Sequence, residues 1–305
     1  MYRDRADDIN NTTKGRVLVQ ARVNGNKPNR RHCIQAAGLT LLALGLAGGP
    51  TGVSAQRFGA QRPLDYRFLA GQDWSALDRD PYFSGMEQDL VAQTNAVRRR
   101  RGLSVLRLDT QLRAIARAHS ADMLARGYFA HQTPEGLSPA DRIAGAYRAF
   151  VGTSGENLWQ VRSPGSVRPM NVSSTAIDDW LNSPSHRDNL LRPDHDVIAI
   201  GVAWRPNMVA VTQLFALPFT LFDRPLAVRW RADQAFSVPD GSVGGFGRPI
   251  ELFWRAPHGE IGEAGRFRLP DARTPGAPGA YQLYLGYPEG GNRLAVAPGP
   301  WIEVG

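Results

Sequence analysis

Cysteine and lysine are almost absent from this sequence. The single cysteine is Cys33, and the two lysines are Lys14 and Lys27, so neither residue type occurs from residue 56 onward. For that part of the chain, this excludes a cysteine nucleophile, a Schiff-base lysine, a Ser-Lys dyad, a Cys-ligated metal and any disulfide. The sequence is compatible with an oxidising compartment, but this part of the chain uses no disulfide bonds.

Long apolar runs are also scarce. Arg30 and Arg31 precede an uncharged run over residues 34–49, which ends in the small residues of segment 53–55. This order predicts a signal peptide cleaved before Gln56 and a secreted, extracytoplasmic protein. The run is about 15 residues long, whereas a bilayer span needs roughly 20, so we favour a signal peptide over a permanent membrane helix.

Most of the net positive charge lies in the first 55 residues. The chain has 36 Lys+Arg and 28 Asp+Glu, of which the first 55 residues hold 8 and 3. The remainder carries a net charge of only about +3, which does not indicate a nucleic-acid or anionic-lipid partner. The basic run 98–101 is interpreted as a solvated helix end that suits the helix dipole.

Two helices are predicted early in the folded part. Apolar residues recur at helical spacing over 85–100, and Gly102 follows them. A second helix has Asp109 as N-cap and ends at Gly127. His119 lies on its apolar stripe, which favours a hydrogen-bonded core histidine over a ligand.

The middle of the chain is predicted to be irregular. Residues 128–174 have no period and contain several prolines and glycines, which indicates a long ordered loop region. A third helix is expected from Ser174 to near Pro184. Segments 197–204 and 208–215 are rich in β-branched and aromatic residues and predict two strands joined as a hairpin.

Short alternating segments beyond Pro218, separated by Gly- and Pro-rich turns, predict a small all-β, sandwich-like domain. Four of its aromatic side chains could stack on sugars, although core packing is favoured: Trp230, Phe253, Trp254 and Tyr281. The chain is divided into an N-terminal extension with signal peptide, a linker, an α/β domain and an all-β domain, over residues 1–55, 56–81, 82–218 and 222–305.

Familiar catalytic motifs are missing. The sequence has no Gly-x-Ser-x-Gly elbow, glycine-rich phosphate loop or His-Glu-x-x-His helix. Three separated polar residues remain in or beside the irregular region: His131, Glu156 and His186. Two imidazoles and a carboxylate could bind a divalent cation such as Zn²⁺, or form a proton-transfer site near neutral pH. Their spacing alone matches no local ligand rule.

The strings around these residues are more specific. Six ordered blocks resemble the signature of the CAP superfamily (SCP-like domain), bacterial secreted branch, over about residues 82–218: AHSADM at 118–123, YFAH at 128–131, DRI at 141–143, GENL at 155–158, WLNSPSHRDNLL at 180–191 and VTQLF at 211–215. The resemblance implies a three-layer α-β-α sandwich. It says nothing about residues 1–80 or 219–305.

The same resemblance implies a cleft lined by His131, His186 and Glu156. Animal and plant relatives add a second glutamate shortly after the tryptophan, where this sequence has Asn182 and Ser183. Asp178 and Asp179, on the other side of Trp180, are speculative substitutes as metal ligands.

Three interpretations of these residues stay open. The first is an extracellular binding or interaction module, whose cleft holds a divalent cation and whose ligand lies outside the cell or in its envelope. The second is a metal-dependent hydrolase of peptide or cell-wall substrates, in which His131 and His186 hold the cation and Glu156 is the general base. The third is a structural network that only orders loops and has no turnover.

Overall fold

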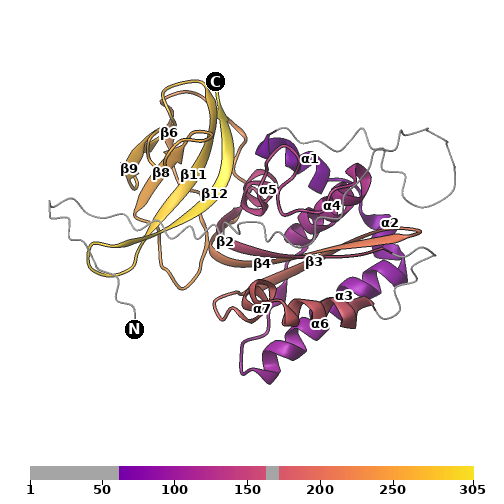
Figure 1. Cartoon of the computed structure of the whole chain (residues 1–305). Coiled ribbons are helices and arrows are strands. Elements are labelled where there is room, and N and C mark those ends of the chain that lie inside the picture. Colours follow the sequence, from indigo (N-terminus) through magenta and orange to yellow (C-terminus); the bar gives the residue numbers. More distant parts are fainter. Residues whose placement is uncertain (1–61, 163–171) are drawn as a thin grey trace, which may run out of the picture.

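The structure is a computed structural model that describes residues 62–162 and 172–305 (Figure 1). The predicted signal peptide lies outside the described residues. Within these two ranges, no helix is both long and apolar enough to cross a membrane.

A five-stranded sheet organises the first part of the molecule. Its order is β1-β3-β4-β2, and β7 adds to the end of β4. The pairs β3/β4 and β2/β4 are antiparallel, and β1/β3 is parallel. The strands are β1 (Arg107–Leu108), β2 (Phe150–Arg162), β3 (Val197–Arg205), β4 (Met208–Phe222) and β7 (Gly241–Val243). β2 therefore lies at an edge of this sheet.

Helices cover both faces of the sheet (Figure 1). One face carries a short 3₁₀ turn and three helices: η2 (Pro63–Asp65), α1 (Tyr66–Ala70), α4 (Thr110–Arg126) and α5 (Pro139–Ala146). The other face carries α3 (Pro81–Arg100), α6 (Val172–Asn182) and α7 (Pro184–Leu191), and α2 (Ser75–Arg79) connects the two layers. The mixed α/β architecture is as predicted.

The two early helices follow the rules that predicted them. The Asp109 side chain accepts a hydrogen bond from the Leu112 amide at 2.9 Å, and Gly127 ends α4 in the left-handed conformation with φ 73°. α3 begins at Pro81, one turn earlier than expected, because Asp80 caps it and proline suits the first helical position.

The basic run 98–101 is only partly a solvated face. Arg99, Arg100 and Arg101 are exposed, as predicted, but the prediction was wrong for Arg98, which is fully buried. Its guanidinium donates to the backbone carbonyls of Ser104, Leu190 and Arg192, so it joins the end of α3 to the end of α7.

The prediction of a long loop over 128–174 was wrong. This range contains α5, the whole of β2 and the first residues of α6. α5 forms because Ser138 and Asp141 make a capping box and Pro139 occupies the first turn. β2 forms because it pairs with β4 along its full length, which compensates for its glycines and polar residues.

The C-terminal part is β-rich, as predicted. A five-stranded sheet has the order β5-β12-β11-β8-β9, and a separate pair joins β10 to β6. The strands are β5 (Arg229–Trp230), β6 (Ala235–Phe236), β8 (Glu251–Arg255), β9 (Arg266–Arg268), β10 (Ala272–Arg273), β11 (Gly279–Pro288) and β12 (Leu294–Val304). The sandwich arrangement stays a prediction.

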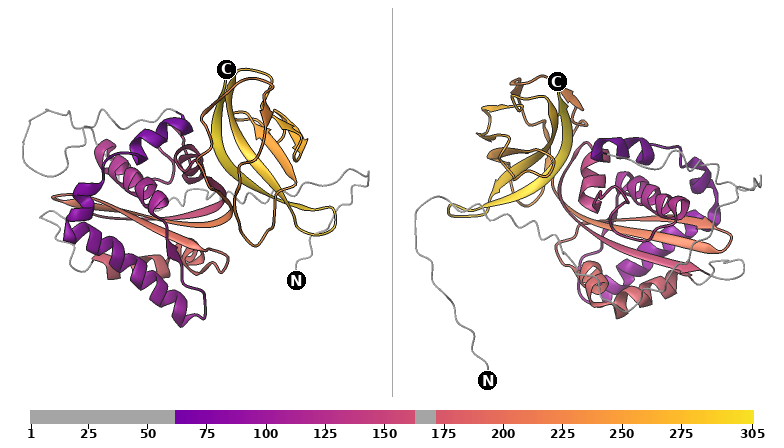
Figure 2. Two further views of the ribbon diagram at one scale, coloured as in Figure 1. Left: turned by 180° about the vertical axis from the view of Figure 1, so that it is seen from behind. Right: turned by 45° about the horizontal axis from the view of Figure 1, so that its top comes forward.

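The two parts lie side by side (Figure 2), and they share one hydrophobic cluster. Val151 and Phe219, from the first sheet, belong to the same hydrophobic cluster as the core of the β-rich part. Residues 62–81, expected to be a linker, contribute buried Tyr66 and Leu69 to the core beneath α4 and α5. The β-rich part is thus fixed against one end of the α/β part.

Candidate functional site

The predicted site residues gather along the edge strand β2. Successive side chains of a strand point to opposite faces, so Glu156 faces the α4/α5 layer and Asn157 faces the α3/α7 layer. His131 comes from the loop after α4, and His186 lies in the first turn of α7. Side chains from the two helical layers therefore meet around one sheet edge.

Glu156 is held from two sides. Its Oε1 accepts a hydrogen bond from Nδ1 of His131 at 2.9 Å, and its Oε2 accepts one from Nη2 of Arg142 at 2.5 Å. The side chains of Glu156 and Arg142 are each 1% exposed, whereas that of His131 is 52% exposed. A buried ion pair thus supports an imidazole that reaches solvent.

The charges around Glu156 keep it ionised. Burial alone would raise the pKa of the Glu156 carboxyl, but the positive charge of Arg142 and the nearby His119 and His131 together lower this pKa well below its usual range. Arg142 also donates to the backbone carbonyl of His131, so it positions the histidine loop as well as the carboxylate.

His186 completes the group from the other layer. Burial and, to a smaller extent, the charge of His131 lower the pKa of the His186 imidazole. Within the described residues, no protein group hydrogen-bonds to the His186 ring, although its backbone carbonyl accepts a bond from Asn157 at 3.0 Å. We call His131, Glu156, Arg142 and His186 together the histidine site.

Amide side chains tie β2 to the α3/α7 layer. Asn157 donates to Gln213 on β4 at 3.0 Å, and Gln213 donates to Thr94 on α3 at 2.9 Å. Asn189 on α7 donates to the Glu156 carbonyl and to the Asn157 side chain, both at 3.0 Å. These buried amides hold the first turn of α7, and with it His186, against β2.

A second polar group fixes the loop that carries His131. His119 is fully buried, and its Nε2 donates to the carbonyl of Ala130 at 3.1 Å. Burial lowers the pKa of His119 to about 3, so its imidazole is neutral at physiological pH. The prediction of a hydrogen-bonded core histidine is confirmed. Tyr128 donates to buried Asp122 at 2.6 Å and anchors the start of the same loop.

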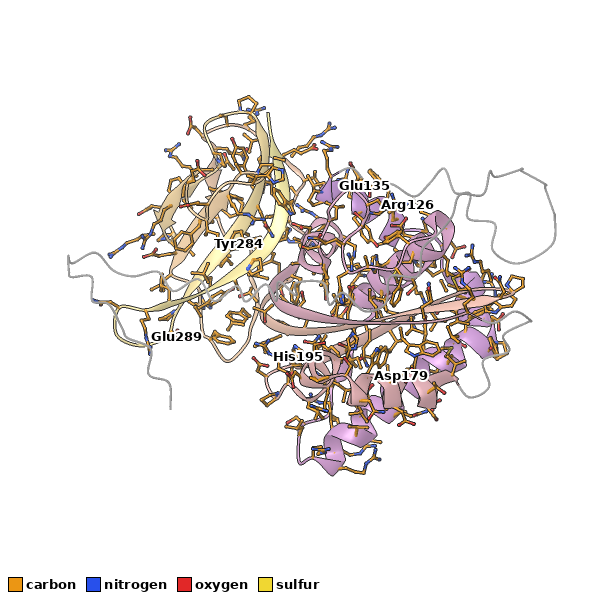
Figure 3. All side chains as sticks on the ribbon, viewed as in Figure 1. Arg126, Glu135, Asp179, His195, Tyr284 and Glu289 are labelled. Carbon is orange, nitrogen blue, oxygen red and sulfur yellow. The ribbon has the colours of Figure 1, made fainter. Side chains whose placement is uncertain are left out.

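Asp179, the speculative metal ligand, pairs with a tryptophan of β2. Its Oδ2 accepts a hydrogen bond from the indole of Trp159 at 2.8 Å, on the α3/α6 face of the sheet. Figure 3 shows Asp179 on that face, while Arg126 and Glu135 lie together on the opposite face. Among the described residues, no group of three or more His, Cys, Asp or Glu side chains has an arrangement that could hold a metal ion.

The residues at the site do not fit a three-ligand cation centre that includes Glu156. Both carboxylate oxygens already accept hydrogen bonds, and the Arg142 guanidinium repels a cation placed against Oε2. Because Nδ1 of His131 donates to Glu156, its Nε2 carries the free lone pair. A carboxylate that orients a histidine in this way is the usual outer partner of a metal-binding imidazole. Among the described residues of the site, the imidazole nitrogens left without a protein hydrogen-bond partner are thus Nε2 of His131 and those of the His186 ring.

Sequence reasoning missed Arg142, Asn189 and His195. Arg142 lies within a recognised block, but no local pattern shows that its guanidinium turns inward toward Glu156. His195 stacks on Phe215 with ring centroids 5.0 Å apart, and its Nδ1 lies 3.1 Å from the carbonyl of Asn189. Burial lowers the pKa of His195 to about 4, which indicates a packed, neutral ring.

Comparison with known proteins supports the resemblance. The family model described as CAP, cysteine-rich secretory protein family, matches residues 91–215. YkwD of Bacillus subtilis (strain 168) is 36% identical over 118 residues, covering 39% of this chain and 42% of that protein. The B. subtilis membrane protein YlbC is 27% identical over 157 residues, covering 48% and 41%. The chain thus spans about two fifths of these relatives.

Solved structures give partial matches. An extracellular protein containing an SCP domain from Bacillus anthracis str. Ames is 30% identical, with 44% of this chain and 41% of that chain covered and a TM-score of 0.36. An outer surface protein from Borrelia burgdorferi is 23% identical, with 42% and 90% covered and a TM-score of 0.36. The family match, the motif blocks and the helices on both faces of the sheet together show that residues 91–215 of this chain are a CAP domain of the cysteine-rich secretory protein family.

Proposed function

We propose that the chain is an extracellular binding or interaction module, whose CAP domain presents His131 and His186 to a ligand in the extracellular space or the cell envelope. The predicted signal peptide and the secretory character of the family support an extracytoplasmic location. The fold does not by itself imply a reaction, so the function depends on the histidine site.

The observation that carries the proposal is the double engagement of Glu156. A general base works best when its pKa lies near the working pH. The pKa of the Glu156 carboxyl lies well below that range, because Arg142 and His131 each hydrogen-bond to it and stabilise its charge. Glu156 thus acts as a fixed anion that orients the imidazole of His131.

A divalent cation is the first ligand proposed for the two imidazoles. Nε2 of His131 and the ring of His186 would supply two nitrogen donors, and Zn²⁺ is a cation that imidazole nitrogen suits. Water or a donor of the bound partner would complete the coordination. Glu156 would act on the cation only through the imidazole of His131.

The alternative of a metal-dependent hydrolase assigns His131 and His186 to the metal and Glu156 to the base. It requires Glu156 to accept a proton, which removes the negative charge that faces Arg142. Leaving the buried Arg142 without its anion is costly, so the binding function is the better supported one.

The test is Zn²⁺ titration of the protein by calorimetry, after purification without chelator. His131→Ala and His186→Ala should each weaken Zn²⁺ binding by roughly tenfold or more, because each removes one of two protein donors. His258→Asn is the matched control. His258 is an exposed histidine with φ 62°, a conformation that asparagine tolerates. Unchanged affinity in both alanine variants would refute the cation proposal.

A second measurement separates binding from turnover. We expect no chelator-sensitive hydrolysis of peptide or cell-wall substrates by the wild-type protein. Hydrolysis that disappears with chelator and in His131→Ala would instead establish the hydrolase.

A further inference from the structure

An open pocket lies in the β-rich part, away from the histidine site. Its volume is about 720 Å³, and it lies where β5, the end of β12 and the start of β11 run side by side. Arg229 is aligned with Glu303 and Trp230 with Val304, while Gly279 and Ala280 on β11 face these residues with almost no side chain. The small side chains of Gly279 and Ala280 leave room for the pocket, and Arg62, from the start of the described chain, lines another side of it.

The pocket has a surplus of positive charge. Three arginines and one acid line it. Arg62 is committed to Asp65 at 3.0 Å and to Glu303 at 2.8 Å. Arg229 is 90% exposed and reaches only Glu303, at 3.8 Å. Arg231 is exposed, and no acid within the described ranges pairs with its guanidinium.

Two further groups give the pocket specific chemistry. Gln234 accepts a hydrogen bond from the Arg231 amide through Oε1, so its NH₂ group remains as a donor. The ring of Trp230 is held in place, because its indole N–H donates to the Ala227 carbonyl at 2.9 Å and it packs on buried Phe236 with centroids 5.0 Å apart. The ring is preorganised and lines the hollow.

Trp230 differs from the other aromatic residues considered for sugar stacking. Phe253, Trp254 and Tyr281 are 2%, 0% and 8% exposed, so their rings belong to the core, as predicted. Trp230 is the member of this set that remains partly exposed. It also lies beside the exposed guanidinium groups of Arg229 and Arg231.

We infer that this pocket binds an anionic saccharide, with a sugar ring against Trp230 and its carboxylate or phosphate group paired with Arg229 and Arg231. Guanidinium groups match the geometry of carboxylate and phosphate oxygens, and aromatic rings stack on the apolar face of a sugar. The excess of donors over acceptors in the lining selects a ligand rich in acceptor oxygens. Neither the cation site nor the histidines take part.

The size and form of the pocket favour a saccharide over a nucleic acid. Single-stranded nucleic acids bind along basic grooves that carry successive stacking rings. This pocket has one stacking ring, that of Trp230, and its hydrogen-bond donors line one cavity. Its volume is of the order that accommodates one or two sugar units, within the usual range of small-ligand sites.

The test is calorimetric or fluorescence titration of the full chain with a short oligogalacturonate, whose every unit carries a carboxylate. The methyl ester of the same oligosaccharide is the neutral control, and a sugar phosphate distinguishes phosphate from carboxylate recognition. Binding should quench Trp230 and weaken with salt. The double variant Arg229→Gln/Arg231→Gln should lose at least about tenfold in affinity.

Control variants keep the outcome interpretable. Arg224→Gln removes an exposed arginine outside the pocket and should leave the affinity unchanged. Trp230→Phe retains a ring and should bind more weakly than wild type but better than Trp230→Leu. Equal binding of the neutral ester, equal loss in Arg224→Gln, or no binding of either acidic probe at millimolar concentration would overturn the inference. Tighter binding of a single-stranded oligonucleotide would replace the saccharide.

Discussion

Four of the arginines in the described ranges are buried, and their surroundings differ. Arg142 faces Glu156, and Arg117 faces Glu87 at 2.7 Å, so each neutralises a buried carboxylate. Arg98 and Arg148 face backbone carbonyls instead. Because a guanidinium stays charged and offers five donors, it can replace water around carboxylates and carbonyls alike. Two of these arginines, Arg98 and Arg142, thus hold segments around the histidine site in place.

Replacement of Glu156 by glutamine should expose the dependence of Arg142 on its anion. Glu156→Gln keeps the shape of the side chain but leaves Arg142 charged and buried, so we expect a loss of about 3 kcal/mol in the free energy of unfolding at neutral pH. Urea denaturation measures this loss. Glu289→Gln is the control, because Glu289 is exposed on the β11–β12 connection of the β-rich part (Figure 3). A loss below about 0.5 kcal/mol would contradict the role given to the pair.

The ion pair between Glu156 and Arg142 predicts that the stability of the protein depends on pH. The folded-state pKa of Glu156 is lowered, so the ion pair contributes fully above the unfolded pKa of about 4.3 and is lost as pH falls below it toward the folded value. The stability difference between wild type and Glu156→Gln should therefore shrink through this acid range and stay constant from about pH 5 to pH 8. A difference that persists unchanged in strong acid would refute the ionised state.

At the scale of elements, β2 is an edge strand whose free carbonyls are partly covered. Asn189 donates to the carbonyl of Glu156, and the indole of Trp180 donates to that of Leu158, both at 3.0 Å. An uncovered edge invites pairing with another chain. Side chains from α6 and α7 thus both close the edge and place His186 beside it.

Asn189→Ala should loosen this arrangement. It leaves the Glu156 carbonyl and the Asn157 side chain without their donor, so a loss of roughly 1–3 kcal/mol in the free energy of unfolding is expected. Zn²⁺ binding should weaken as well, as expected for His186→Ala, since α7 would shift. Thermal denaturation and Zn²⁺ titration measure the two effects. Asp188→Ala, an exposed neighbour, is the control, and equal behaviour of the two variants would contradict the edge role.

The elements that the sequence predicted well have their signals nearby in the chain. α4 has a cap at Asp109, a stop at Gly127 and an apolar stripe between them. β2 was missed because its signals are distant: the buried Asn157 finds its hydrogen-bond partners on β4 and α7, at His186, Asn189 and Gln213. In the site, the motif blocks identified His131, Glu156 and His186, but not the inward direction of Arg142. Such buried polar contacts depend on tertiary structure, which residue spacing does not encode.

At the scale of the whole molecule, the two parts are joined through buried polar contacts and a common core. Arg148, two residues before β2, donates to the carbonyls of Leu226, Ala227 and Trp301 in the C-terminal part. Burial lowers the pKa of Arg148 to about 10, which leaves it charged at physiological pH. Val151 packs within the β-rich core, so the boundary between the parts is not a flexible hinge.

Arg148→Met should weaken both parts together. It fills similar space but leaves three carbonyls without their donor, so a loss of about 3 kcal/mol or more is expected. In the wild type, tryptophan fluorescence and far-ultraviolet circular dichroism should report one coincident unfolding transition. Arg224→Met, at an exposed position, should behave as wild type. Separate transitions in the wild type would show that the parts unfold independently.

The run of β4 across both parts also bears on the order in which the protein matures. Arg148 donates to the carbonyl of Trp301 across 153 positions of the chain, and β4 pairs with β7, whose residues follow it. A growing or translocating chain cannot bury Val151 and Phe219 until the final strands have emerged. Such distant closures are slow to form. The junction between the two parts is therefore expected to form last in folding, once the whole polypeptide is available.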